Sequence, residues 1–237
     1  MKQSFLALSA MALVLSTSAT AEDQQKFDEK YFTIQKIEMV EEGVQEDAAP
    51  VADGSDLQCF DGASLGETAV IIDQIIQLGE KVWKIVEANK PVVSVTEAPR
   101  ASALPKGADS WLQLAGWQNP KARVFRVSYK NLYGMNVVDF SFRVTYSSGG
   151  NVRGKGAYLA NVSVLPANLQ VAWGFTFNAG VEVANVLNAG SAQSPVAGME
   201  LLIRWQIDTV VKHERSTASY FVRGDGGFVD MTNGTKN

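Results

Sequence analysis

The stretch Val138-Asp-Phe-Ser-Phe-Arg-Val-Thr-Tyr146 shows most directly how this chain folds. Apolar and polar side chains alternate along its whole length. Because successive side chains of a β-strand point to opposite sides, the apolar ones line one face and the polar ones the other. The pattern therefore predicts a strand with one face in a hydrophobic core and one face in water.

The same two-residue period recurs along most of the chain after Val92. Short alternating segments separated by turn residues are typical of antiparallel β architecture. We therefore expect a mostly β protein, an antiparallel β-sandwich of Greek-key or jelly-roll-like topology. An outer-membrane β-barrel is the alternative, since its strands also alternate. Three further apolar rows support the prediction: Phe125, Val127 and Tyr129; Leu169, Val171, Trp173, Phe175 and Phe177; and Met199, Leu201, Ile203, Trp205 and Ile207.

One segment follows a different period. Between Gly66 and Asn89 the apolar residues recur at spacings of three and four, which predicts an amphipathic α-helix. Pro91 ends this pattern, because proline interrupts a helix. We expect the helix of residues 66–89 to pack on the sandwich through a wide apolar face that includes Ile71, Ile75, Leu78, Val82 and Ile85.

The N-terminal residues predict export. Lys2 precedes an apolar run from Phe5 to Leu15, and the small residues from Ala19 to Ala21 fit a signal-peptide cleavage site. The run is shorter than the about 20 residues that a membrane-spanning helix needs. We therefore expect a cleaved signal peptide at residues 1–21, no transmembrane helix, and a periplasmic or secreted protein of bacterial origin.

The exported chain divides into two parts by charge. Residues 22–61 hold 12 of the chain's 25 acidic residues and only three basic ones, whereas basic residues outnumber acidic ones after Asp61. We expect an acidic N-terminal arm over 22–61, with a strand at 31–40 and then a loop, followed by a single β-rich domain over 62–237 that begins with the helix. The arm either stays solvated or lies on the mildly basic body. Cys59 is the only cysteine, so no internal disulfide can form.

Two features that resemble catalytic or nucleotide-binding motifs have simpler interpretations. Gly149-Gly-Asn-Val-Arg-Gly-Lys155 matches part of a phosphate-binding loop, but an alternating strand follows where a helix should begin, so we expect a hairpin. His213, the only histidine, stands in a charged run typical of a solvated strand end. Because the chain has a single histidine, a metal site with several histidine ligands is also excluded. We therefore predict no catalytic residue, cofactor or metal ligand.

Trp111 and Trp117 are the speculative binding residues. They flank the sequence Leu-Gln-Leu-Ala-Gly, close to a turn. Aromatic rings beside amide groups are suited to stacking on sugars, although a strand tryptophan is more often part of the core. The pair is therefore a candidate glycan-binding platform.

The tripeptide Arg223-Gly-Asp225 has two interpretations. It acts as an adhesion signal in some secreted proteins. Asp-Gly is also a strong signal for a tight hairpin when it lies between two β-prone runs, as it does here. The hairpin is the simpler prediction.

Together these features predict an exported, non-enzymatic binding or structural protein of a bacterial envelope. Its partner would be an envelope glycan or another envelope protein, and the acidity of the chain argues against nucleic acid. The alternative is a secreted carbohydrate-active hydrolase, which would need a pair of carboxylates. The candidates for that pair are Asp139, Glu182, Glu200 and Asp208.

Overall fold

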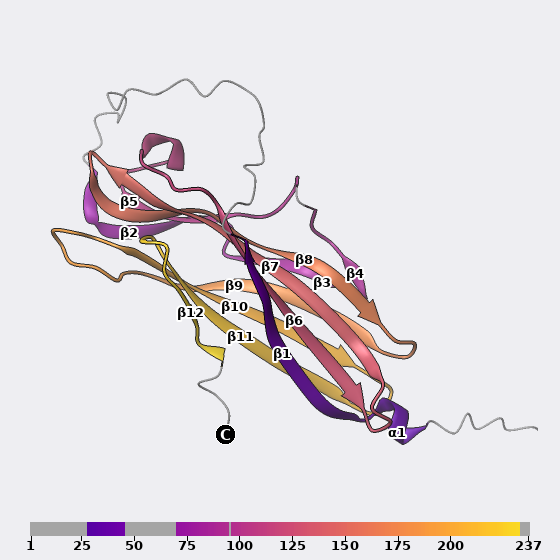
Figure 1. Cartoon of the computed structure of the whole chain (residues 1–237). Coiled ribbons are helices and arrows are strands. Elements are labelled where there is room, and N and C mark those ends of the chain that lie inside the picture. The colour runs from indigo at the N-terminus through magenta and orange to yellow at the C-terminus, as the bar shows by residue number, and fades with distance from the viewer. Residues whose placement is uncertain (1–27, 46–69, 95, 233–237) are drawn as a thin grey trace, which may run out of the picture.

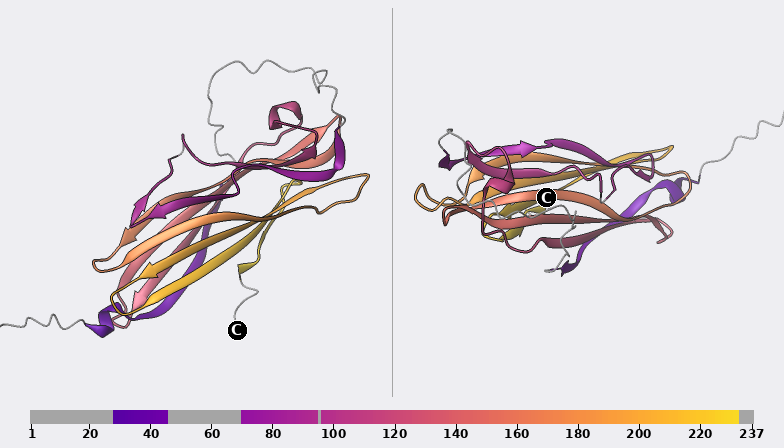
Figure 2. Two further views of the ribbon diagram at one scale, coloured as in Figure 1. Left: turned by 180° about the vertical axis from the view of Figure 1, so that it is seen from behind. Right: turned by 90° about the horizontal axis from the view of Figure 1, so that it is seen from above.

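Two antiparallel β-sheets stacked face to face form the body of the molecule (Figures 1 and 2). The computed structural model describes residues 28–45, 70–94 and 96–232. The first sheet has the strand order β1-β6-β7-β8-β5-β2 and the second has the order β12-β11-β10-β9-β3-β4. The predicted antiparallel β-sandwich is thus confirmed.

The strands are longest at the centre of the first sheet, where β7 and β8 form a hairpin. The elements are α1 (Glu29–Phe32), β1 (Ile34–Gln45), β2 (Ile71–Gly79), β3 (Val82–Glu87), β4 (Lys90–Pro91), β5 (Ala101–Lys106), the 3-10 helix η1 (Trp111–Gln113), β6 (Lys121–Asn131), β7 (Asn136–Val152), β8 (Lys155–Val171), β9 (Thr176–Asn188), β10 (Ala197–Asp208), β11 (His213–Arg223) and β12 (Phe228–Asp230).

A continuous hydrophobic core lies between the sheets. The alternating rows predicted in β6, β7 and β10 are all buried, since their apolar side chains point toward the opposite sheet. Phe125 of β6 packs against Tyr220 of β11, with ring centroids 4.5 Å apart. Phe140 of β7 packs against Phe177 of β9 at 4.8 Å. Aromatic pairs of this kind therefore join the two sheets along the core.

A hydrogen-bonded group also links the sheets inside the core. The Trp205 indole N–H of β10 donates to the Tyr129 hydroxyl of β6, which lies 3.0 Å from the Ser216 hydroxyl of β11. Burial raises the pKa of Tyr129, although these hydrogen bonds act in the opposite direction. A buried polar group needs a hydrogen-bond partner, and sliding one sheet over the other would break these bonds. The three side chains therefore favour the observed alignment of the two sheets.

The helix expected at residues 66–89 is wrong for the described part of that segment, residues 70–89. Strands β2 and β3 occupy it and are joined by a turn at Gly79. Gly79 has a φ of +87°, and a Cβ there would lie 2.2 Å from the Arg100 carbonyl oxygen, so the position suits glycine alone. Pairing of β2 with β5 and of β3 with β9 overrides the helical spacing of the apolar residues.

Part of the acidic arm forms an edge strand of the first sheet. β1 pairs antiparallel with β6 from Ile34 to Gln45, so it starts later and ends later than the strand predicted at 31–40. The short helix α1 precedes it, with the Asp28 carboxylate accepting hydrogen bonds from the first backbone N–H groups. The signal peptide predicted at 1–21 and Cys59 lie outside the described residues.

The prediction of one apolar row from Leu169 to Phe177 is wrong at the centre of that segment. β8 ends at Val171 and β9 begins at Thr176, so Trp173 lies in the turn between them. Its side chain is 75% exposed. The alternation continues through this turn in the sequence, but the backbone reverses there, and Trp173 faces water while Phe175 returns to the core.

Within the described ranges, no helix has both the length and the apolar character needed to cross a membrane.

Candidate functional site

The short helix η1, which begins at Trp111, lies at the end of the sandwich opposite α1 (Figure 1), and Trp111 and Trp117 lie side by side. Their rings meet edge to face with centroids 6.2 Å apart, and the Trp117 indole N–H donates to the Trp111 carbonyl oxygen. The Trp117 ring also covers Gly150, where a Cβ would lie 2.3 Å from it. Both rings pack partly against the core. The structure brings the two residues together, and their sugar-binding role stays a prediction.

Both glycine-containing motifs form hairpins, as predicted. Arg153 and Gly154 form the turn between β7 and β8. Arg223 ends β11, and the chain then reverses into β12. The Arg223 guanidinium donates to the Asp225 carboxylate at 2.6 Å, which lowers the pKa of Asp225. The two charges of the tripeptide are therefore paired with each other.

His213 lies at the exposed start of β11, in agreement with the predicted strand end. Its Nδ1 is 2.6 Å from a carboxylate oxygen of Asp208, the last residue of β10. Burial raises the pKa of Asp208, but hydrogen bonds from His213 and Gln206 outweigh this effect and lower it. The pair closes the β10–β11 hairpin, and Asp208 is already hydrogen-bonded to two side chains.

The other carboxylates considered for glycoside hydrolysis each have a polar or charged partner of their own. Glu182 of β9 pairs with Arg204, and Glu200 of β10 accepts a hydrogen bond from the Ser219 hydroxyl. Asp139 lies on the other sheet. In the part of the chain that the structure covers, no three His, Cys, Asp or Glu side chains group closely enough to hold a metal ion.

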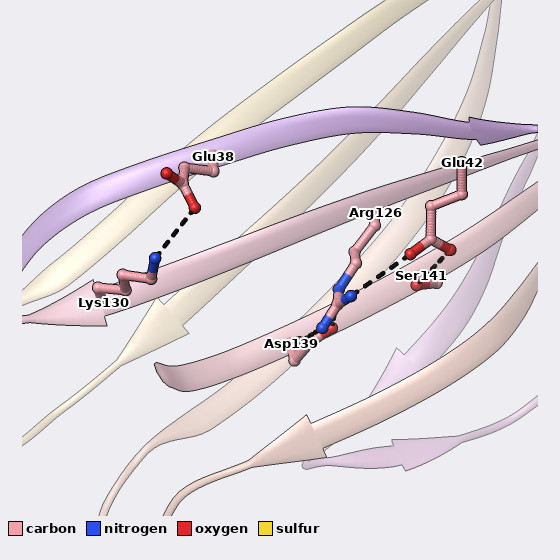
Figure 3. Close-up of polar contacts among 6 residues, drawn as sticks. All are labelled: Glu38, Glu42, Arg126, Lys130, Asp139 and Ser141. Carbon is pink, nitrogen blue, oxygen red and sulfur yellow. Dashed lines mark hydrogen bonds and ion pairs between the residues drawn. The ribbon is translucent and has the colours of Figure 1, made fainter. Parts of the chain in front are cut away.

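A charged network covers the outer face of the first sheet, on β1, β6 and β7 (Figure 3). Its centre is Arg126, whose Nε lies 2.8 Å from Asp139 Oδ1 while a second nitrogen contacts the other carboxylate oxygen. The Asp139 side chain is only 7% exposed, because the guanidinium covers it. Hydrogen bonding to Asp139 raises the pKa of Arg126. Arg126 also reaches Glu42 of β1 at 3.5 Å.

Acidic residues of β1 pair with basic residues of β6 along the whole edge. Glu38 lies 3.2 Å from Lys130 (Figure 3), and Glu41 lies 2.9 Å from Arg123. The sequence predicts that the acidic arm either stays solvated or lies on the basic body. Residues 34–45 lie on the basic body. Every carboxylate of this network is matched by a cation. We therefore assign the network a structural role, which is to hold β1 on the first sheet.

An open groove with a volume of about 540 Å³ lies on the outer face of the second sheet. Lys84, Gly180, Arg204 and Thr217 stand directly opposite one another on β3, β9, β10 and β11. The next row along the same face contains Asn178, Gln206 and Arg215. Gly180 has no side chain, so the surface is hollow between its two cationic neighbours.

Positive charge predominates in this groove. Lys84, Arg204 and Arg215 line it, against the single carboxylate of Glu87. Lys84 pairs with Glu87, and Arg204 pairs with Glu182 beside the groove. Among the described residues Arg215 has no ion-pair partner, and its Nε donates to Gln206 at 3.0 Å. Its terminal nitrogens therefore remain as hydrogen-bond donors for a ligand.

The groove thus offers guanidinium, ammonium, amide and hydroxyl groups around the hollow at Gly180. Planar guanidinium groups bind carboxylates and phosphates in a two-pronged manner. Neighbouring strands lie about 4.8 Å apart, so cations on β3, β10 and β11 can contact successive groups of an extended ligand. The arrangement is suited to binding an elongated anion.

No protein-family model, curated protein or solved structure matches this chain. The groove is therefore interpreted through its own chemistry.

Sequence reasoning missed the groove because its residues come from four strands that are distant in the chain. Lys84 lies in the segment that the apolar spacing predicts to be a helix, and Gly180 sits in an otherwise regular alternation. The one usable signal is Arg204, which alternates with the buried row of β10 and therefore lies on the outer face of that strand. Only strand pairing shows that it stands beside a glycine and opposite further polar side chains.

Proposed function

We propose that the protein is an exported, non-enzymatic binding protein of the bacterial envelope, and that it binds an acidic glycan in the groove of the second sheet. The observation that carries the binding proposal is the convergence of Lys84, Arg204 and Arg215 around the hollow at Gly180. The N-terminal signal pattern of residues 1–21 supports export.

The chemistry of the groove favours a glycan with carboxylate or phosphate groups over a protein partner. Eight of the twelve residues that line the open groove are polar or charged, and the lining lacks the exposed aromatic or aliphatic anchors that usually dominate a protein interface. Trp205 contributes to the lining, but its side chain is buried and its indole N–H is used inside the core. Hydrogen bonds and charge, rather than ring stacking, would therefore supply the affinity.

Calorimetric titration with two oligosaccharides of equal length tests this function. An oligomer of a uronic acid should bind, and a neutral glucose oligomer should not. Affinity should fall with rising salt, since the contacts are charged and exposed. The Arg215→Gln and Arg204→Gln variants should each weaken binding by about tenfold, the scale of one charge-assisted hydrogen bond.

Lys155→Gln is the matched control, because it removes one exposed positive charge at the β7–β8 hairpin, away from the groove. It should leave the affinity unchanged. Equal binding of the neutral oligomer, or full affinity in both arginine variants, would contradict the proposal.

A further inference from the structure

Three turns at one end of the sandwich expose large apolar side chains. They connect β6 to β7, β8 to β9 and β10 to β11, and they lie at the end that holds α1 (Figures 1 and 2). Strand pairing places them together, since Asp208 at the end of β10 pairs with Thr176 at the start of β9. We call the exposed side chains of these turns the apolar tip: Leu132, Tyr133, Met135, Trp173, Val210 and Val211.

The exposure of these side chains is large. Trp173 is 75% exposed, and the other five side chains of the apolar tip are between 45% and 55% exposed. The hairpin turns at the opposite end differ: they contain Arg153-Gly154, a loop rich in Gly, Ser and Ala after β9, and Gly224 to Gly227. Turns usually consist of such small and polar residues. A cluster of large apolar side chains on three neighbouring turns marks an interaction surface.

Hydrogen bonds hold the β6–β7 turn in place. The buried Asn131 carboxamide accepts from the Tyr133 and Met135 N–H groups and donates to the Tyr31 carbonyl oxygen of α1. The Tyr133 hydroxyl donates to Asp28 at 2.9 Å. The turn and α1 therefore form one unit, with Leu132 and Met135 projecting from it.

The other two turns are also well supported. Tyr31 donates its hydroxyl hydrogen to the Trp173 carbonyl oxygen, and the Phe32 ring lies where a side chain on Gly174 would be. In the β10–β11 turn the Thr209 hydroxyl accepts from the Val211 and Lys212 N–H groups. Backbone groups that are paired in this way can enter an apolar environment at low cost.

Charge contributes little to this surface. The residues of the three turns include one charged side chain, Lys212, which pairs with Glu214. α1 adds Asp28, Glu29 and Lys30 beside them. A partner that binds at this end of the sandwich must therefore bind mainly through apolar contacts.

We propose that the apolar tip docks the protein on a phospholipid bilayer, with the six side chains in the interfacial layer and the sandwich outside it. Tryptophan and tyrosine favour that layer because their rings are amphipathic. The described chain begins at Asp28, at this same end, so before cleavage the predicted signal run Phe5–Leu15 would bring this end of the sandwich, and not the opposite one, toward the membrane. The proposal is independent of the groove and of its ligand.

Vesicle co-sedimentation of the protein purified after export tests the proposal. The protein should bind phosphatidylcholine vesicles, bind about equally when an anionic lipid is added, and stay bound at high salt, because apolar contact supplies the affinity. Replacing Leu132, Met135 and Trp173 together by Ser should lower partitioning by at least about tenfold, given the apolar area lost. The matched control replaces Leu112, Leu187 and Val229 by Ser, three exposed side chains away from the tip, and should bind as the parent does.

Lipids carrying a quencher in the headgroup region give a second measurement. They should quench part of the tryptophan emission, and the quenched part should disappear in Trp173→Phe. Thermal unfolding temperatures equal to that of the parent confirm that the Ser variants fold. If the triple variant does not fold, the single variant Trp173→Ser takes its place. Absence of vesicle binding, or equal loss in tip and control variants, would overturn the proposal. Tip-dependent capture of an envelope protein without vesicle binding would replace the bilayer by a protein partner.

Discussion

Tyr158 is a single side chain that fastens the edge strand β2 to the first sheet. Its hydroxyl donates to the Ile72 carbonyl oxygen at 2.6 Å. Burial, assisted by the charge of Asp73, raises the pKa of Tyr158 to about 12. The hydroxyl therefore keeps its proton, and its hydrogen bond, well above the pH at which an exposed tyrosine ionises.

Replacing Tyr158 by Phe should lower the free energy of unfolding at neutral pH by about 1 kcal/mol, the usual net value of one hydrogen bond. Because the pKa is higher in the folded state than its ordinary value of 10.0, the stabilisation is complete below pH 10 and is lost as the pH rises toward 12. The difference between parent and variant should therefore shrink between these limits. Denaturant unfolding at pH 7 and pH 11 measures it, and a constant difference would contradict the assigned hydrogen bond.

Gly224, the middle residue of Arg-Gly-Asp, is fixed by packing. A Cβ there would lie 2.0 Å from the backbone oxygen of Ala157 in β8. Gly224→Ala should thus destabilise the protein by about 2 kcal/mol or more, as overpacking against a backbone does. Gly43→Ala is the control, because no atom lies within 4 Å of its added Cβ. Thermal unfolding of both variants checks this, and equal stabilities would show that the turn is freely adjustable.

The edge strand β1 depends on charge more than any other described strand. Hydrogen bonds from Lys36 and Lys130 lower the pKa of Glu38 below its ordinary value of 4.5. A lowered pKa means that this stabilisation is present above pH 4.5 and is lost as the pH falls below it. The attachment of β1 to β6 should therefore weaken in mild acid before the core does.

Amide hydrogen exchange, corrected for intrinsic rates, measures this effect. Protection in β1 should fall between pH 6 and pH 3.5, while protection in β10 stays constant. In Glu38→Gln the β1 amides should be less protected at pH 6 and change less with pH. A parallel loss in β1 and β10 would mean that the whole sandwich loosens together.

At the level of elements, alternation predicted the central strands well and the peripheral ones poorly. The β6, β7 and β10 rows are buried on one face by the opposite sheet, so their pattern is set by the core. In β2, Ile71 and Ile72 occupy an edge strand whose register is shifted before Ile75, so apolar residues appear on both faces at nearly helical spacing. Edge strands and bulges weaken the two-residue signal that identifies a strand.

On the scale of the whole molecule, the groove lies close to the apolar tip. Gln206 and Arg215 line the groove, and each is two residues from the end of its strand at the β10–β11 turn, a rise of roughly 7 Å along the strand. A protein docked by its tip would hold the groove beside the membrane surface. Its ligand would then be a polymer attached to, or lying close to, that surface.

The two surfaces differed in how far the sequence could predict them. Local alternation assigns Trp173 of the apolar tip to a strand, and only the chain reversal reveals its exposure. The groove cations come from strands whose pairing is not encoded locally. The class of fold follows from periodicity, whereas both surfaces depend on contacts between distant segments.

The strand order also determines the order in which the strands can pair during folding. β7 and β8 are joined by a tight turn and can pair as soon as both are synthesised, whereas β1 needs β6 and β3 needs β9, far along the chain. Pairing of distant segments is slow because loop closure must come first. The N-terminal strands β1 and β3 are thus among the last to find partners. A chain of this design must keep β1 from pairing elsewhere until β6 is present, and β3 until β9 is present.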